Sequence, residues 1–162
     1  MKAHPKTRVY ICGKSGKALK ELILSNAGSL VEVDKSRKIN PNIFSLGQMR
    51  ADTGRGILYE QALVVKSPNG FSVVTGCAHP GIVRIVRRAV KIFGKNIYAI
   101  CGGFHMKNNT REQNSKIIAE LQALGVKKVI PLHCTGAAAR QLFQKAYGRG
   151  FARFHEGQTV KL

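Results

Sequence analysis

Three histidines stand in short turns that contain glycine, each after an apolar run of strand-like composition and before a run with helical periodicity. They are His79, His105 and His133. Neutral imidazole is a common ligand of zinc and related ions, and a nearby glycine lets the backbone turn tightly beside a ligand. In an open α/β sheet, side chains at the carboxyl ends of neighbouring strands point into one crevice. We therefore expect a metal or anion site at one edge of a sheet.

Four other residues accompany these histidines. Glu60 is the nearest candidate carboxylate, and Cys134 adjoins the third histidine and is the best placed thiol for a metal ligand. Thr135 and Gly136 lie between a strand and its helix, where a threonine can cap the helix and backbone N–H groups can face an anion. The cysteines form no CxxC pair, so buried packing thiols without a disulfide framework are the simpler interpretation. The spacing leaves open whether His105 contacts metal or substrate.

Hydrophobic periodicity predicts an α/β protein with a single core. Amphipathic runs predict four helices, at residues 17–24, 81–93, 112–124 and 137–147. A strand pair around Asn69-Gly70 predicts a hairpin, because these two residues accept positive φ. The polar segment 35–57 predicts two short strands with a mobile loop around 51–57, and residues 151–154 and 159–162 predict closing strands. His4 and His155 lack the strand-end context and are interpreted as ordinary polar residues.

The charge balance is unusual. The chain of 162 residues has 27 Lys and Arg against 8 Asp and Glu, for a formal net charge of +19. Such an excess favours an anionic small molecule, an acidic protein surface or nucleic acid as partner, although no arginine-rich tract or RNA-binding motif singles out nucleic acid. No apolar run is long enough to cross a bilayer and the first residues lack a signal-peptide pattern, which predicts a cytoplasmic protein without a membrane partner.

Three motifs resemble the back half of a metallo-β-lactamase-fold hydrolase. They are Gly76-Cys-Ala-His-Pro-Gly-Ile-Val83, Gly102-Gly-Phe-His105 and Pro131-Leu-His-Cys-Thr-Gly-Ala137. The most similar subgroup is the dihydropterin–ribofuranosylaminobenzene phosphate synthase-like one, which His4-Pro5, Glu60-Gln-Ala-Leu-Val-Val65 and Phe154-His-Glu-Gly157 also resemble. The resemblance covers essentially the whole chain. It implies that residues 1–162 form one domain, the C-terminal half of an αββα sandwich, with a mixed sheet and helices on one face.

The resemblance also implies a metal centre. One or two divalent ions (zinc, manganese or iron) would lie at the edge between the two halves of the sandwich, with His79 on the first metal and His133 on the second. His105 would lie beside the metals or contact substrate. The HxHxDH motif that supplies most ligands in this family has no counterpart here, so the ligand set is incomplete and the N-terminal half is expected to be missing. An aspartate expected after Gly102-Gly103 is also absent, and Tyr59-Glu60 stands where relatives have an acidic pair.

These departures predict that the isolated chain is inactive and that one face of its sheet exposes a large apolar patch. The leading hypothesis is a truncated or split metal-dependent hydrolase domain. It would act on an anionic, phosphorylated substrate together with a complementary N-terminal half, or through self-association. The alternative is a basic, non-catalytic binding module for nucleic acid or an acidic partner, and a third possibility is a remnant without function.

Overall fold

The computed structural model describes residues 3–154 and 157–159. His155 and the predicted closing strand at 159–162, except Thr159, lie outside the described residues. The strands are β1 (His4–Ile11), β2 (Ala27–Glu32), β3 (Arg37–Asn40), β4 (Ile43–Ser45), β5 (Met49–Asp52), β6 (Ile57–Glu60), β7 (Leu63–Ser67), β8 (Gly70–Val74), β9 (Ile97–Gly103) and β10 (Lys128–Leu132). The helices are α1 (Lys17–Asn26), α2 (Ile82–Phe93), α3 (Arg111–Ala123) and α4 (Ala137–Tyr147), with short 3-10 turns η1 (His133–Thr135) and η2 (Gly148–Gly150).

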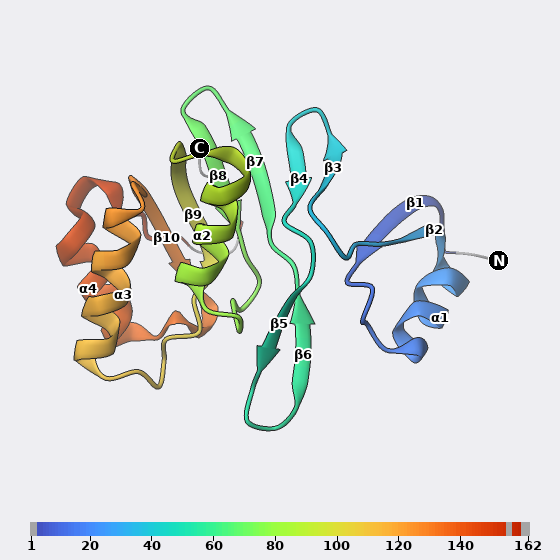
Figure 1. The fold of residues 1–162 in the computed structure, drawn as a ribbon, viewed down its shortest axis with the longest axis horizontal. Coiled ribbons are helices and arrows are strands. Elements are labelled where there is room, and N and C mark those ends of the chain that lie inside the picture. The colour runs from blue at the N-terminus through green and yellow to red at the C-terminus, as the bar shows by residue number, and fades with distance from the viewer. Residues whose placement is uncertain (1–2, 155–156, 160–162) are drawn as a thin grey trace.

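The main sheet has six strands in the order β10-β9-β8-β7-β4-β3. Strands β8, β9 and β10 are parallel, whereas β7, β4 and β3 continue the sheet in antiparallel fashion. Helices α2, α3 and α4 lie on one face of this sheet (Figure 1). The prediction of a mixed sheet with helices on one face is therefore confirmed. Because β8, β9 and β10 run in the same direction, their carboxyl ends meet at one edge.

The core lies between this sheet and its helices. Helix α2 buries Ile82, Ile85, Val86 and Ala89, which lie on one face at helical spacing. Leu121 of α3 and Phe143 of α4 are both fully buried in the same cluster. These three helices, and α1 at the predicted residues 17–24, thus form where the periodicity places them.

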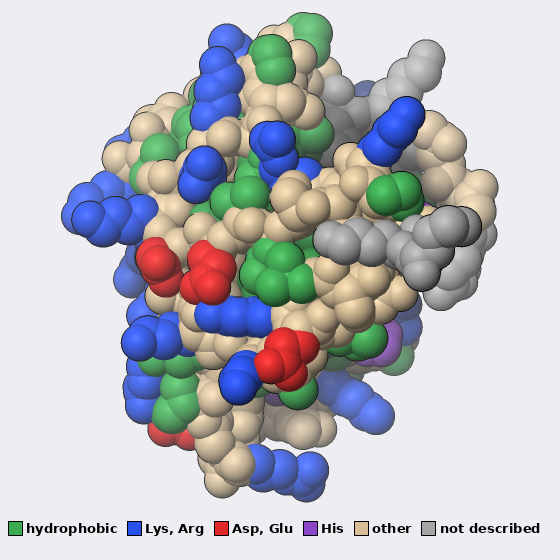
Figure 2. Space-filling model, turned by 90° about the vertical axis from the view of Figure 1, so that its right-hand side faces the viewer, with side chains coloured by type: hydrophobic (Ala, Val, Ile, Leu, Met, Phe, Trp, Pro, Cys, Tyr) green, Lys and Arg blue, Asp and Glu red, His purple; other side chains and the backbone are tan. Residues whose placement is uncertain are grey.

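The N-terminal residues form a separate, smaller unit. Strands β1 and β2 are parallel, form a two-stranded sheet and are joined by α1. Helix α1 has no buried residue, and Leu19, Leu22 and Leu24 are 47%, 61% and 46% exposed. On this face of the molecule apolar side chains are visible among many Lys and Arg side chains and few acidic ones (Figure 2).

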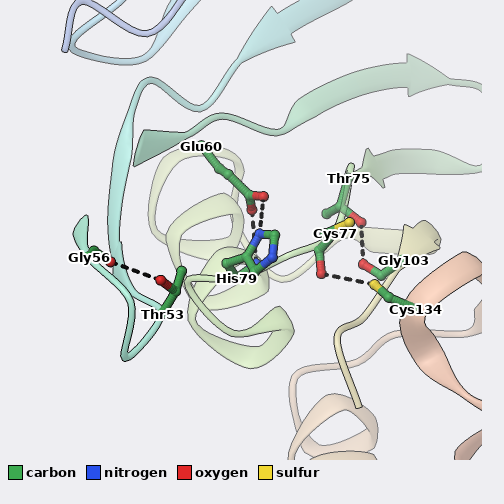
Figure 3. Close-up of polar contacts among 8 residues, drawn as sticks. All are labelled: Thr53, Gly56, Glu60, Thr75, Cys77, His79, Gly103 and Cys134. Atoms are coloured by element: carbon green, nitrogen blue, oxygen red, sulfur yellow. Dashed lines mark hydrogen bonds and ion pairs between the residues drawn. The ribbon is translucent and has the colours of Figure 1, made fainter. Parts of the chain in front are cut away.

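Two expectations need correction. The sequence favours an apolar patch on one sheet face, but the residues of β9 and β10 are buried or half-buried, and three of the six large exposed apolar side chains in the described residues lie on α1. The predicted loop at 51–57 is a hairpin of β5 and β6, closed by a turn in which Thr53 donates to Gly56 (Figure 3). Its strand β5 alternates buried and exposed residues, a period of two that polar composition conceals in the sequence. In the described part of the chain, no helix is long and apolar enough to span a membrane.

Candidate metal centre

Backbone strain marks the edge where the three parallel strands end. Among the described residues, the only non-glycine residues with positive φ are Ala78 (57°), His105 (51°) and His133 (41°). Each lies in the loop that follows β8, β9 or β10. A left-handed conformation costs an L-residue roughly 1–2 kcal/mol, and such strain clusters at functional sites. The loops 75–81, 104–107 and 133–136 are called the rim below. Other contacts must hold the rim in place, because its backbone conformation costs free energy.

Hydrogen bonds between the loops supply the restraint on the rim. The first two loops are joined at Gly103, whose N–H donates to Gly76 O (2.8 Å) and whose carbonyl accepts from Thr75 Oγ1 (3.1 Å). The second and third are joined where Met106 N donates to Cys134 O (3.2 Å). Cys134 Sγ lies 3.5 Å from Cys77 O and links the third loop back to the first (Figure 3). All three strand ends are thus connected to one another.

Thr135 belongs to this network. Its side chain is fully buried, donates to Leu132 O (2.7 Å) and accepts from Phe104 N (3.1 Å). The N-cap of α4 is Gly136, and no side chain caps that helix, so the suggestion that Thr135 caps it is wrong. Both hydrogen-bonding directions of the Thr135 hydroxyl are used within the protein. Its predicted contact with an anion stays a prediction.

Glu60, at the end of β6, holds His79 at two points (Figure 3). Its Oε2 accepts from the His79 backbone N–H at 2.9 Å, and its Oε1 lies 2.5 Å from His79 Nδ1. The two side chains are 23% and 24% exposed. A carboxylate acceptor keeps the proton on Nδ1, so the lone pair of Nε2 is left for another partner.

His105 lies beside His79, with ring centroids 4.4 Å apart and an angle of 50° between the rings. The two rings border a pocket of about 230 Å³ whose other lining side chains are mainly apolar: Ile82, Val83, Phe104, Met106 and Ile117. His133 is exposed on the same rim. The structure therefore brings His79, His105 and Glu60 together and places His133 on a neighbouring loop.

Comparisons with known proteins show which proteins this chain is similar to. The chain is 33% identical to the 7,8-dihydropterin-6-methyl-4-(β-D-ribofuranosyl)-aminobenzene-5'-phosphate synthase of Methanocaldococcus jannaschii, over 93% of the chain and 59% of that protein. It superposes on the crystal structure of Tm1679, a metal-dependent hydrolase of the β-lactamase superfamily, with a TM-score of 0.80, 25% identity and coverage of 97% of this chain and 72% of that one. This chain is a metallo-β-lactamase-fold protein.

Two further comparisons show how far the similarity of this metallo-β-lactamase-fold chain to known proteins extends. Its match to an uncharacterized protein of M. jannaschii, MJ0448, is 27% identical over 54% of the chain and 32% of that protein. No protein-family model matches the chain. The chain spans 59% of the length of the M. jannaschii synthase. The expectation that an N-terminal half lies elsewhere stays a prediction.

The side chains of this metallo-β-lactamase-fold chain that could ligate a metal fit such an ion only in part. A metal-binding histidine typically donates its second ring N–H to a carboxylate, which is the arrangement of His79 and Glu60. However, the described residues contain no group of three His, Cys, Asp or Glu side chains that could hold an ion. The predictions that His79 and His133 ligate metals, and that Cys134 is a ligand, therefore remain predictions. The described residues by themselves do not make a complete site.

Burial raises the pKa of the Cys77 thiol, and its hydrogen bond with Cys134 raises it further. Desolvation likewise raises the pKa values of Cys12 and Cys101. All four cysteines are free. A thiol with a raised pKa is a weaker nucleophile at neutral pH, and packing stays the simpler interpretation of Cys77.

Lys107, a residue of the metallo-β-lactamase-fold rim, could not be recognised from the sequence. A β-carbon at Gly136 would lie 2.9 Å from Lys107 Cα, so Gly136, with a φ of +81°, lets the second loop pass close to the start of α4. Lys107 is exposed there and adds a cation to the rim. In the sequence it stands in a polar loop beside two asparagines, with no spacing that would distinguish it from the other lysines.

Proposed function

We propose that this chain supplies one part of the active site of a metal-dependent hydrolase, and that the remaining metal ligands come from a polypeptide segment outside these 162 residues. The observation that carries the proposal is the Glu60–His79 pair, a carboxylate-oriented imidazole at a strained rim whose Nε2 has no hydrogen-bond partner among the described residues. The absence of an HxHxDH motif from the sequence supports an outside source for the other ligands.

In this proposal His79 and His133 each give one nitrogen to a divalent ion, zinc, manganese or iron. When bound, such an ion would supply Lewis-acid activation of water for attack on an electrophile. Glu60 is a positioning residue that holds the His79 ring. His105, whose ring lies 4.4 Å from that of His79, orients the substrate at the mouth of the pocket.

We propose an anionic, phosphorylated substrate. The name of the M. jannaschii relative describes a 5'-phosphate, and the net charge of +19 attracts anions to the surface. Lys107 and the first backbone N–H groups of α4, after Gly136, would face the phosphate. The apolar lining of the 230 Å³ pocket suits an uncharged ring of the same substrate.

The proposed partner is a complementary segment that covers α1. An amphipathic helix is stabilised mainly by packing of its apolar face, and α1 has none of its residues buried. The synthase relative has further residues beyond the region that this chain matches, which offers a source for such a segment. The four free thiols support a reducing compartment such as the cytoplasm.

Metal analysis tests the proposal. We would purify the chain alone and together with the part of the M. jannaschii synthase that the match leaves uncovered, and measure bound zinc, manganese and iron. We expect the mixture to retain at least one ion per chain and to lose it in His79→Ala. His4→Ala, which removes an exposed histidine far along the chain from the rim, is the matched control and should retain the ion. Absence of metal from the mixture would overturn the proposal.

A second experiment separates ligands from positioning and substrate-orienting residues. Glu60→Gln keeps an acceptor but removes the charge behind His79, so metal affinity should fall about 10–100-fold. His105→Ala should leave metal content unchanged and raise KM for a phosphomonoester or phosphodiester substrate. Loss of metal from His105→Ala would instead make His105 a ligand. Light scattering of the chain alone tests self-association as the source of the missing ligands.

A further inference from the structure

A long stretch of this chain carries positive charge without acidic residues. No Asp or Glu occurs between Gln61 and Arg111. Within it, α2 presents Arg84, Arg87, Arg88 and Lys91 at intervals of i, i+3, i+4 and i+7, which place them on one helical stripe. This stripe is the face opposite Ile85, Val86 and Ala89, so packing against the sheet does not explain it.

The stripe borders a groove. An open depression of about 570 Å³ is lined by Lys35, Ser36, Arg87, Arg88, Lys91 and Ile92. Four of these six side chains are cationic, and they come from α2 and from the turn between β2 and β3. Two distant segments of the chain therefore contribute charge to one groove, away from the rim that carries His79.

The charge in the groove is mostly uncompensated. Arg87 pairs with Glu120 at 2.7 Å, and Arg88 donates to the backbone carbonyl of Gln48 at 3.4 Å. Among the described residues, neither Lys35 nor Lys91 makes an ion pair. Like charges brought together repel one another, so such a groove is stabilised by an anion that spans it.

We propose that this groove binds the phosphodiester backbone of a single strand of nucleic acid. Four cations line the groove, and one of them, Arg87, is already paired with Glu120, so about three phosphates would be neutralised there. No aromatic side chain lines the groove to stack a base, so recognition is independent of sequence.

An acidic protein partner fits the groove less well. Protein interfaces depend on buried aromatic and aliphatic anchors, and the only large apolar side chain in this groove is Ile92, which is 41% exposed. A phosphate chain needs no such anchor because charge neutralisation and counterion release supply its affinity. The groove thus favours a polyphosphate strand on chemical grounds.

Fluorescence anisotropy tests this inference. A labelled single-stranded RNA of about 20 nucleotides and mixed sequence is titrated with the full chain from about 50 to 200 mM salt. With about three phosphates neutralised, affinity should fall about 20-fold over that range. Lys35→Ala/Lys91→Ala, which removes the two cations without an ion pair among the described residues, should reduce the slope of log affinity against log salt by about 1.4, at about 0.7 per phosphate contact.

The matched control is Arg149→Ala/Lys145→Ala, which also removes two positive charges, from exposed positions at the end of α4. It should leave the slope within about 0.3 of the unmodified chain. An equal loss in both variants would attribute binding to diffuse charge and overturn the proposal. Competition by poly-glutamate as effective as unlabelled RNA would overturn it in favour of an acidic protein. Circular dichroism confirms that each variant is folded.

Discussion

In three places of the described chain one helix joins two parallel strands, and two of these units lie in very different surroundings. In β8–α2–β9 and in β1–α1–β2, one helix joins two parallel strands. Helix α2 buries four residues, whereas α1 buries none. Both helices carry apolar residues at helical spacing, but the pattern is much more strongly amphipathic in α2 than in α1, so the sequence accounts for part of the difference in burial.

The width of the sheet under each helix contributes the rest of the difference in burial. Neighbouring strands lie about 4.8 Å apart, whereas a helix with its side chains is about 10–12 Å wide. A two-stranded sheet is therefore too narrow to cover one face of a helix. Helix α2 lies on a six-stranded sheet and also packs against α3, while β1 and β2 form a sheet of their own. The comparison teaches that α1 needs further strands or another surface before its leucines contribute to stability.

Core truncation should separate the two units most clearly. Phe143→Ala removes a fully buried ring and should lower the free energy of unfolding by about 3–5 kcal/mol. Leu22→Ala, at a side chain that is 61% exposed, should change it by less than about 0.5 kcal/mol. Urea denaturation followed by circular dichroism measures both.

The variants Phe143→Ala and Leu22→Ala also compare the two units when the proposed partner segment is present. Once α1 is covered, Leu22→Ala should weaken binding of that segment. The loss of affinity caused by Leu22→Ala should be the same with and without Phe143→Ala, because Leu22 and Phe143 lie in different units. A large loss of stability from Leu22→Ala in the chain alone would mean that α1 is already packed.

Local patterns in the sequence predict the larger unit well. The structure contains helix α2 where the spacing of apolar residues predicts it, and a β7–β8 hairpin whose turn ends at Asn69-Gly70. The same rules underestimate β5, because its buried residues, Met49 and Ala51, are few and separated by charged ones. Short strands bury too little apolar surface to leave a clear pattern.

The candidate site could be predicted in position but not in geometry. Parallel strands bring their carboxyl ends together, which placed the histidine loops at one edge from sequence alone. The strained φ of Ala78, the two contacts of Glu60 with His79 and the proximity of Lys107 to Gly136 depend on how separate loops pack. No single stretch of sequence encodes such contacts, so only coordinates reveal them.

Glycine replacement tests whether the end of β9, where it meets the rim, is more tightly packed than the turn of the β5–β6 hairpin. A β-carbon at Gly102, whose φ is +130°, would lie 2.2 Å from Thr75 O, whereas Gly54, with a φ of +74°, has open space around it. Gly102→Ala combines strain and a backbone clash and should cost about 2–4 kcal/mol. Gly54→Ala adds strain alone and should cost about 1 kcal/mol. Equal costs in urea denaturation would contradict the close packing where β9 meets the rim.

Removal of the Glu60 carboxylate should have a smaller effect on stability. Glu60→Ala breaks the hydrogen bonds to His79 N and Nδ1 and should cost about 1–3 kcal/mol, since one partner remains partly buried. Glu60→Gln retains an acceptor for the backbone N–H and should lose about half as much. NMR of the imidazole nitrogens should show the His79 proton on Nδ1 in the unmodified chain and a mixture of tautomers in Glu60→Ala. An unchanged tautomer would show that the pair does not orient the ring.

The smallest effect is expected at Tyr147, at the end of α4. Its hydroxyl is buried and has no hydrogen-bond partner among the described residues, and burial raises the pKa of Tyr147 to about 12. Since the neutral phenol is favoured in the folded chain, this stabilising contribution is complete below pH of about 10, the usual pKa of tyrosine, and is lost as pH rises toward about 12. Tyr147→Phe keeps the ring contact with Phe143 and removes the unpaired hydroxyl, so stability at neutral pH should stay equal or rise by up to about 1 kcal/mol. Absorbance titration should show a late ionising tyrosine that disappears in Tyr147→Phe and persists in Tyr10→Phe; a late step in both variants would assign it to another residue.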